Sequence, residues 1–464
     1  MSTIVDKLNR LAQYKLDIKN SIISKGQTVG DNMSEFADAI SKISGGVEIP
    51  EILDTDPLTF VRVDNATVDG SISIVNNGVT NTKQFQYNKN DNGWTDYIVG
   101  DIIHMDYGDK VQFRSNDTTD LCTSLNAYRN FKTIGLYDCG GTLASLMNNN
   151  TTISLHSYCF NHLFYYCNIV NAPILPWEHI NSNCYDNMFT GCTSLVNAPA
   201  LPATTLANYC YQFMFQNCTS LVNAPSLPAT KIASNCYKSM FQNCTSLVNA
   251  HKLPATTLAS NCYSNMFNGC TSLVNAPELP ATTLADGCYD SMFYSCTSLV
   301  NAHELPATTL AYGCYSNMFN GCTSLVNAPA LHATTLASNC YQFMFQNCTS
   351  LVNAPELPAT TLASNCYQFM FTGCTSLVNA PELPATTLAS NCYYYMFGSC
   401  TKLNTIKAKC MYSSGTTLIT SSISSSWLFN VSPKGTFYKN PDWSGPTSRG
   451  PNTIPSDWTI VDWV

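Results

Sequence analysis

The sequence predicts a β-rich solenoid of 26-residue repeats, preceded by a small antiparallel β-sandwich and an N-terminal α-helical hairpin. Three observations lead to this fold class. Twenty of the 23 cysteines form ten Cys-x7-Cys pairs, which recur every 25 or 26 residues from Cys159 to Cys400. Residues 57–117 alternate between apolar and polar side chains, as half-buried strands do. Residues 3–43 instead place apolar side chains three or four positions apart, as amphipathic helices do.

The composition limits the classes of function that fit. Of the 464 residues, 45% are apolar and only 11% are charged, whereas an ordinary globular chain has about 25% charged residues. The net charge of -8 argues against binding to nucleic acid or to an anionic membrane surface, both of which need basic patches. No window has the roughly 18 consecutive apolar residues of a spanning helix, so we expect no membrane insertion. We also expect no standard export signal, because charges are spread through the N-terminus.

Residues 1–45 are predicted to form the helical hairpin. The first apolar face ends near Gly26, a residue type that often terminates helices, and a second runs from Met33 to Ile43. The spacing is close to the roughly 3.5-residue repeat of a coiled coil, which suits a homo-oligomer. The alternative is a helical hairpin that packs against the rest of its own chain. The residues predicted to form the anchor face are Ile4, Leu8, Leu11, Ile18 and Ile22.

Part of this segment resembles a known class of protein. The residues "IKNSIISKGQTVGDNMSEFADAISKI" are similar to the N-terminal anchors of bacteriophage virion proteins, particularly tail fibre and tail-associated proteins of gut phages. The resemblance implies that the N-terminal helices bind other virion proteins. It agrees with the expected lack of an export signal.

Residues 57–117 are predicted to form the β-sandwich, after a Pro-containing linker. The six expected strands are "LTFVRV", "GSISIV", "KQFQYN", "WTDYIV", "DIIHM" and "DKVQFR", with turn signals such as "NNG" and "NDNG" between them. Six short strands at this spacing are typical of a small antiparallel sandwich. Residues 118–154 lack such alternation, and we expect them to form an irregular N-terminal cap on the repeats.

Residues 155–410 contain the ten cysteine pairs, with the consensus "CYxxMFxxCTSLVNAPELPATTLASN". Three columns of leucine and one of Met-Phe recur at the same repeat positions. A single coil cannot bury these side chains, but stacked neighbours can. Because proline cannot donate a hydrogen bond to a ladder, "LVNA" is expected to carry most of the strand pairing. Residues 411–464, with four tryptophans, are expected to form a C-terminal cap.

The repeats also resemble a known family. The run "CTSLVNAPELPATTLASNCYQFMF" is similar to the BspA-like leucine-rich repeats of bacterial surface proteins, which also place an aromatic residue, a cysteine and "TSL" before a short strand. The resemblance covers about residues 155–410. It implies a right-handed solenoid with short parallel strands.

The cysteine columns allow three interpretations. Disulfides would need an oxidising compartment, which the missing export signal does not favour. A zinc site would need closer Cys-x2-4-Cys spacing and a tetrahedral ligand set. We therefore interpret the cysteines as free, small, buried hydrophobic residues.

The motifs of common enzyme classes are absent from the sequence. It contains no GxxxxGK[ST], GxGxxG or GxSxG motif. The run "HELPA" at His303 begins like a zinc motif, but position 307 is Ala307 and Pro306 excludes a helix. Paired carboxylates could suggest a glycosidase. The carboxylates here share one repeat column, however, and are explained more simply as a row of solvent-exposed side chains. We predict a non-enzymatic protein without a cofactor or a metal site. The carboxylates of that column are Glu278, Glu304, Glu356 and Glu382.

Two neighbouring repeat columns vary far more than the core columns and are therefore expected to be exposed. They mix Asn, Gln, Ser and Lys with aromatic residues. Aromatic rings beside amides can stack on sugars or fill protein pockets, so we predict an adhesive surface here; scattered surface aromatics without a partner are the alternative. The predicted binding residues are Phe213, Phe343, Phe369, Tyr394 and Tyr395.

Together these features favour a bacteriophage virion structural protein, such as a tail fibre, receptor-binding or decoration protein, located in the virion. Its expected partners are other virion proteins and a host-surface glycan or protein. The first alternative is a BspA-like adhesin on the cell surface of a gut bacterium. A lectin-like accessory module of an enzyme is the second.

Overall fold

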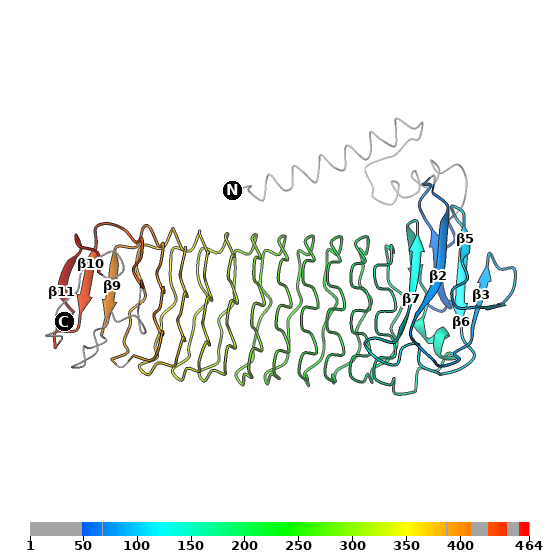
Figure 1. Ribbon diagram of the computed structural model, residues 1–464, viewed down its shortest axis with the longest axis horizontal. Coiled ribbons are helices and arrows are strands. Elements are labelled where there is room, and N and C mark those ends of the chain that lie inside the picture. Colours follow the sequence, from blue (N-terminus) through cyan, green and yellow to red (C-terminus); the bar gives the residue numbers. More distant parts are fainter. Residues whose placement is uncertain (1–48, 67, 387, 410–425, 443–453, 464) are drawn as a thin grey trace, which may run out of the picture.

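The computed structural model describes residues 49–66, 68–386, 388–409, 426–442 and 454–463. Within these ranges the structure is β-rich, and its one helical element is the short 3-10 helix η1 (Leu143–Met147). Two sheets lie at one end of an elongated molecule, a stack of coils follows, and a third sheet lies at the other end (Figure 1). No helix in these ranges is long and apolar enough to cross a membrane. The predicted helical hairpin and its anchor residues lie outside the described residues.

The first two sheets, here called the paired sheets, are antiparallel and have the strand orders β4-β3-β6-β1-β8 and β5-β2-β7. Their inner faces meet in an aromatic cluster, in which the ring centroids of Phe60 on β1 and Phe131 on β7 lie 5.1 Å apart. All six strands predicted between residues 57 and 117 are confirmed. The strands are β1 (Leu58–Arg62), β2 (Gly70–Asn77), β3 (Phe85–Lys89), β4 (Thr95–Tyr97), β5 (Ile103–Met105), β6 (Lys110–Arg114), β7 (Tyr128–Ile134) and β8 (Tyr137–Gly140).

The prediction that residues 118–154 are irregular is wrong, because they supply β7, β8 and η1. Strand β7 pairs with β2 over seven residues. Its alternation is hidden in the sequence because Arg129 occupies a buried position, where its guanidinium donates to the side-chain and backbone oxygens of Asn81. Strand β8 then leads into the first coil, where the backbone N–H of Tyr137 donates to Asn168 O at 3.1 Å. The paired sheets therefore cover the open end of the coils.

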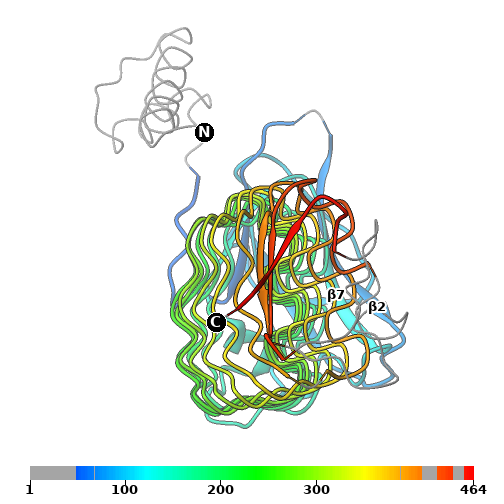
Figure 2. The same cartoon turned by 90° about the vertical axis from the view of Figure 1, so that its left-hand side faces the viewer.

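The coils form what we call the repeat stack (residues 155–409). Parallel bridges join equivalent residues one repeat apart, for example Asn197 to Asn223 and Thr257 to Thr283. Viewed along the axis, the coils superimpose in register (Figure 2). The 26-residue periodicity of the sequence is thus the periodicity of the structure.

Most of the backbone pairing between coils does not lie in "LVNA", contrary to the prediction. That segment contributes single bridges at its asparagine. In the "CYxxMFxxC" segment, by contrast, the backbone N–H of every second residue donates a hydrogen bond to a backbone carbonyl oxygen of the next coil, at 2.8–3.0 Å. In one coil the donors are Tyr211, Phe213, Phe215 and Asn217. The N–H groups between them bond back three residues, so the segment is a run of tight turns.

These turns require left-handed backbone at every fourth residue. In one coil Tyr209, Phe213 and Asn217 have φ of 60°, 55° and 61°. Asparagine and glycine tolerate this conformation best, and they recur at these positions throughout the stack.

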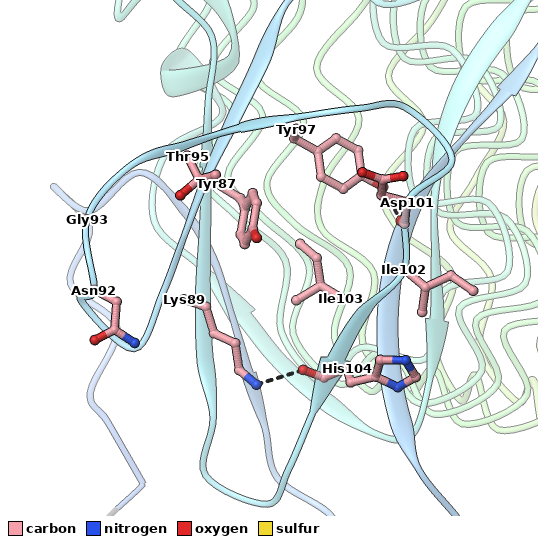
Figure 3. Close-up of a pocket in the computed structure, with 10 residues that line it drawn as sticks. All are labelled: Tyr87, Lys89, Asn92, Gly93, Thr95, Tyr97, Asp101, Ile102, Ile103 and His104. Atoms are coloured by element: carbon pink, nitrogen blue, oxygen red, sulfur yellow. Dashed lines mark hydrogen bonds between the residues drawn. The ribbon is translucent and has the colours of Figure 1, made fainter.

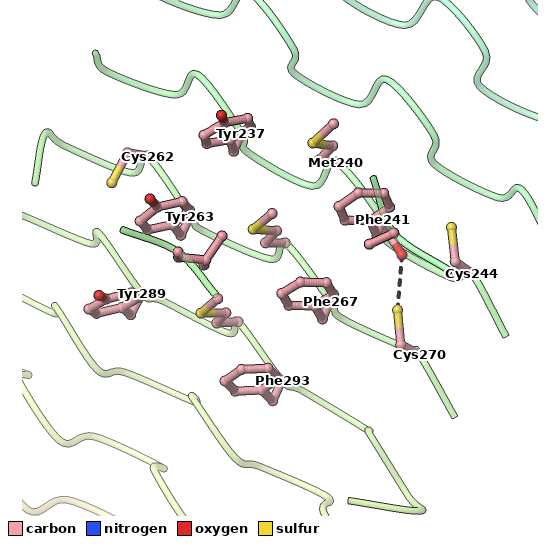
Figure 4. Close-up of a cluster of buried hydrophobic side chains, with 14 of the residues drawn as sticks. Tyr237, Met240, Phe241, Cys244, Cys262, Tyr263, Phe267, Cys270, Tyr289 and Phe293 are labelled. Carbon is pink, nitrogen blue, oxygen red and sulfur yellow. Dashed lines mark hydrogen bonds between the residues drawn. The ribbon is translucent and has the colours of Figure 1, made fainter. Parts of the chain in front are cut away.

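The core of the repeat stack consists of columns of identical side chains (Figure 4). Rings of the buried tyrosine column, such as Tyr237 and Tyr263, stack 5.7 Å apart, and those of the phenylalanine column, such as Phe241 and Phe267, lie 5.5 Å apart. Two of the predicted leucine columns are buried, whereas the third, at the Leu258 position, is partly exposed in several coils.

All described cysteines are free and buried, so their burial is confirmed. In each coil from the second to the tenth, the second thiol also donates to a phenylalanine carbonyl of the preceding coil, as Cys270 Sγ does to Phe241 O at 3.1 Å. Burial raises the pKa of these thiols well above its ordinary value, as at Cys270. They therefore stay protonated and can donate.

The far end of the stack carries a three-stranded parallel sheet of β9 (Thr405–Ala408), β10 (Thr436–Lys439) and β11 (Thr459–Asp462). Trp427 and Trp458 are buried there. The Trp427 ring continues the tyrosine column by stacking on Tyr393, with centroids 6.2 Å apart. Apolar surface of the last coil is thereby covered.

Candidate functional site

The candidate site lies on the tight turns of the last three cysteine-paired coils. Four of the predicted binding residues meet there, and we call them the aromatic strip: Phe343, Phe369, Tyr394 and Tyr395. Three of these residues occupy the left-handed position in the middle of the turn segment, with φ of 58° at Phe343, 57° at Phe369 and 52° at Tyr395. The repeat period alone brings them together, because equivalent positions in successive coils are neighbours in space.

The rings of the aromatic strip stack on one another. Phe343 and Phe369 have centroids 4.8 Å apart and planes 12° apart, and Phe369 and Tyr395 follow at 5.4 Å and 21°. Tyr394 meets the Phe369 ring edge-on at 5.2 Å. Each stacked or edge-on pair contributes about 0.5–1.5 kcal/mol beyond its buried area. This offsets the roughly 1–2 kcal/mol that left-handed backbone costs a residue with a side chain.

The expectation that these positions are exposed is wrong. All four side chains are half-buried: Phe343, Phe369 and Tyr395 cover one another's faces by stacking, and Tyr394 contacts Phe369 edge-on. Ring edges and the two tyrosines therefore form the solvent-facing part of the strip.

Amides lie directly beside the aromatic strip. In the neighbouring column Gln342 Nε2 donates to Gln368 Oε1 of the next coil, and Tyr394 holds the equivalent position one coil further. The turn segments 339–348, 365–374 and 391–400 contain no charged residue. The surface thus offers hydrogen bonds and apolar contacts, and these turn segments carry no charge that would attract or repel a charged ligand.

Phe213, the fifth predicted binding residue, is half-buried and does not join the strip. It occupies the same column with φ of 55°, but polar residues separate it from Phe343. The intervening residues of the column are Ser239, Asn265, Ser291 and Asn317.

Sequence reasoning missed Phe429, which extends the strip. Its ring lies 5.9 Å from Tyr395 and is 40% exposed, more than any member of the strip. Ser399 N–H donates to Phe429 O at 2.7 Å, so residues 426–430 continue the turn ladder beyond the last cysteine pair. The run "SWLFN" is the only sequence signal of this degenerate coil.

A second aromatic cluster lies at the other end of the same face and was also missed. Tyr128 from β7 stacks on His162 at 4.4 Å, His162 contacts Tyr165 at 4.9 Å, and Tyr165 contacts Tyr166 at 4.5 Å. Burial lowers the pKa of His162 to about 4, so the ring is neutral at physiological pH. Tyr166 is 61% exposed.

The structure also places the other residues that the sequence singles out. The glutamate column is solvent-exposed, and Glu278 and Glu382 make ion pairs with Lys252 and Lys407 at 2.8 and 3.0 Å. In the described part of the chain, no three His, Cys, Asp or Glu side chains are placed to hold a metal ion. The predicted anchor residues lie outside the described residues.

Comparisons with protein-family models, with curated proteins and with solved structures find no match to this chain.

Proposed function

We propose that the chain is a non-enzymatic structural protein of a bacteriophage virion, acting as a tail fibre, receptor-binding or decoration protein. Its repeat stack is a BspA-like leucine-rich-repeat solenoid that displays an adhesive face toward the bacterial host surface. The N-terminal helices bind other virion proteins, and the paired sheets act as a small sandwich that spaces the solenoid from them.

The aromatic strip is the observation that carries this proposal. Three of its four half-buried rings are set on left-handed backbone, where asparagine costs less, and most other coils have asparagine or serine in this column. Aromatic residues are therefore present at positions where their backbone conformation is unfavourable. This favours the interpretation that the rings contact a partner over the interpretation that they only stabilise the fold. Amide neighbours and the absence of charge suit a neutral glycan or an uncharged protein surface.

The position of the strip supports the same proposal. The paired sheets and the coils that carry the aromatic strip lie toward opposite ends of the long axis (Figure 1). The paired sheets contain the first described strand, β1, and so lie nearer to the N-terminus in sequence. A protein held at its N-terminus by a particle would therefore present the strip at its distal end.

The alternative is a cell-surface adhesin of a gut bacterium, which the resemblance of the repeats favours. The genes that flank the coding sequence discriminate between the two: portal and tail genes accompany a virion protein, and export machinery accompanies a surface adhesin.

The proposal is tested on particles purified from the source culture by density-gradient centrifugation. Peptides of this chain should be found in intact particles by mass spectrometry, and antibodies to the repeat stack should label those particles under the electron microscope. Recovery of the chain only in bacterial envelopes would overturn the proposal and favour the surface adhesin.

A further inference from the structure

The paired sheets contain a hollow of about 550 Å³ that is separate from the aromatic strip (Figure 3). It lies between the β3–β4 hairpin and the segment that leads into β5. The volume is within the roughly 300–1,000 Å³ range of small-molecule sites. The residues around it are Tyr87, Lys89, Asn92, Gly93, Thr95, Tyr97, Asp101, Ile102, Ile103 and His104.

The floor of the hollow is formed by two tyrosine rings and an isoleucine. The Tyr87 and Tyr97 rings meet edge-on with centroids 6.1 Å apart, and Ile103 is buried beside them. The Tyr97 hydroxyl accepts from the backbone N–H of Ile74 at 2.8 Å and donates to Asp101 O at 2.6 Å. Its hydrogen bonds are therefore satisfied, and Tyr97 is fixed in place.

Polar groups around this floor are free to bind a ligand. The hydroxyls of Tyr87 and Thr95, the amide of Asn92 and the carboxylate of Asp101 have no hydrogen-bond partner among the described residues. Together they can donate and accept several hydrogen bonds to a ligand in the hollow.

The charges at the hollow restrict the class of ligand. The ammonium of Lys89 is already held by the Asp109 carboxylate at 2.7 Å and by His104 O at 2.8 Å. Asp101 is thus the charged group without a partner, and it disfavours an anionic ligand by like-charge repulsion. A ligand that carries hydroxyl groups can bond the free polar groups in place of water, which reaches Asn92, Thr95 and Asp101 because all three are exposed.

We propose that this hollow binds a neutral saccharide unit of the pyranose class. A pyranose has an apolar C–H surface that suits the tyrosine and isoleucine floor. Its hydroxyls both donate and accept, which matches the amide, the carboxylate and the two hydroxyl groups at the hollow. Asp101 accepts from sugar hydroxyls, and its charge strengthens those bonds. The site goes beyond the proposed function and does not depend on it, because it shares no residue with the aromatic strip.

The test uses the full chain and four neutral methyl glycosides, those of glucose, galactose, mannose and N-acetylglucosamine. Binding is measured by saturation-transfer NMR and by isothermal titration calorimetry, with a methyl sialoside as the anionic probe. At least one neutral glycoside should bind saturably and more tightly than the sialoside. Asp101→Asn and Asn92→Ala should each weaken that binding about tenfold, because each removes a hydrogen bond to the ligand.

Asp96→Asn is the matched control, because Asp96 lies on β4 between Thr95 and Tyr97 and alternation directs it away from their face. It should leave affinity unchanged. Failure of all four neutral glycosides to bind, or tighter binding of the sialoside, would overturn the proposal. A third result would also overturn it: Asp101→Asn binds the sugar as tightly as the parent, whereas a variant changed at Phe343, Phe369 and Tyr395 does not bind it. That result would show that the sugar binds at the aromatic strip.

Discussion

The Phe343 and Phe369 rings stack with centroids 4.8 Å apart, closer than any successive pair in the buried phenylalanine column, which are 5.1–5.7 Å apart. Both residues have left-handed backbone, with φ of 58° and 57°. Stacking of half-buried rings and an unfavourable backbone therefore oppose each other at the same residues.

Substitution at Phe343 separates these two contributions. Phe343→Asn loses the stacking but gains a residue that tolerates left-handed backbone, as Asn317 does one coil earlier. Phe343→Ala loses the stacking without that gain. We expect the alanine variant to be less stable than the asparagine variant by about 0.5–1 kcal/mol, measured by urea denaturation. An asparagine variant less stable than the alanine variant would contradict this balance.

The two cysteines of one coil should respond differently to replacement by serine. Cys296 Sγ donates to Phe267 O at 3.1 Å, whereas no carbonyl among the described residues accepts from Cys288. A serine hydroxyl can keep the first hydrogen bond but is buried without an acceptor at the second site. Cys288→Ser should therefore cost about 1–3 kcal/mol in the free energy of unfolding, and Cys296→Ser less. Equal losses in thermal denaturation would refute a structural role for the thiol hydrogen bonds.

Asp186 should make stability depend on pH. Asp186 is 2% exposed, and its carboxylate accepts a hydrogen bond from Asn187 Nδ2 at 2.8 Å. Burial raises the pKa of this carboxyl group to about 7. Because the folded state then holds the proton more tightly than the unfolded chain, with a pKa of about 3.9, Asp186 destabilises the fold increasingly from about pH 4 to pH 7. Above pH 7 the cost is complete.

Asp186→Asn should remove this dependence. The variant should be more stable than the parent at pH 8, by on the order of 2–4 kcal/mol, and similar to it at pH 4. Glu356→Gln, at an exposed carboxylate, is the control and should leave the pH profile unchanged. A parallel profile for parent and Asp186→Asn would show that Asp186 is not the group responsible.

The repeat and the position of the strip could be predicted from sequence because the period itself determines which residues are neighbours. The left-handed turns were not predicted, although Asn, Ser or Gly at every fourth residue, as at Asn183, Asn187 and Gly191, was a usable signal. The burial of the strip depends on ring stacking between coils, which a single repeat does not reveal.

Other features depend on contacts between residues far apart in sequence. Strand β7 forms because it pairs with β2, and its Arg129 is buried only because Asn81 accepts its hydrogen bonds. Phe429 follows a stretch without the repeat pattern, so no column placed it beside Tyr395. The hollow in the paired sheets likewise needs the spatial position of the β3–β4 hairpin next to β5.

Removal of residues 1–45 tests the anchoring role that we propose for this segment. The repeats carry their own core, so the shortened protein should remain folded by circular dichroism. It should be missing from virions produced by a phage that carries the truncated gene, while the parent protein is incorporated. Incorporation of the shortened protein at the parent level would show that the particle contact lies elsewhere.

Attachment to host cells by a strip variant tests the central claim most directly. In the full chain, Phe343, Phe369 and Tyr395 are changed together to Ser, which Ser239 and Ser291 show to be accepted at this column with φ of 54° and 56°. The control is Phe213→Ser, in the same column but outside the strip. Binding of the fluorescently labelled proteins to host cells is then measured by flow cytometry. The account predicts that the triple variant folds but no longer binds, whereas Phe213→Ser binds like the parent. Undiminished binding by the triple variant would contradict an adhesive role for the aromatic strip.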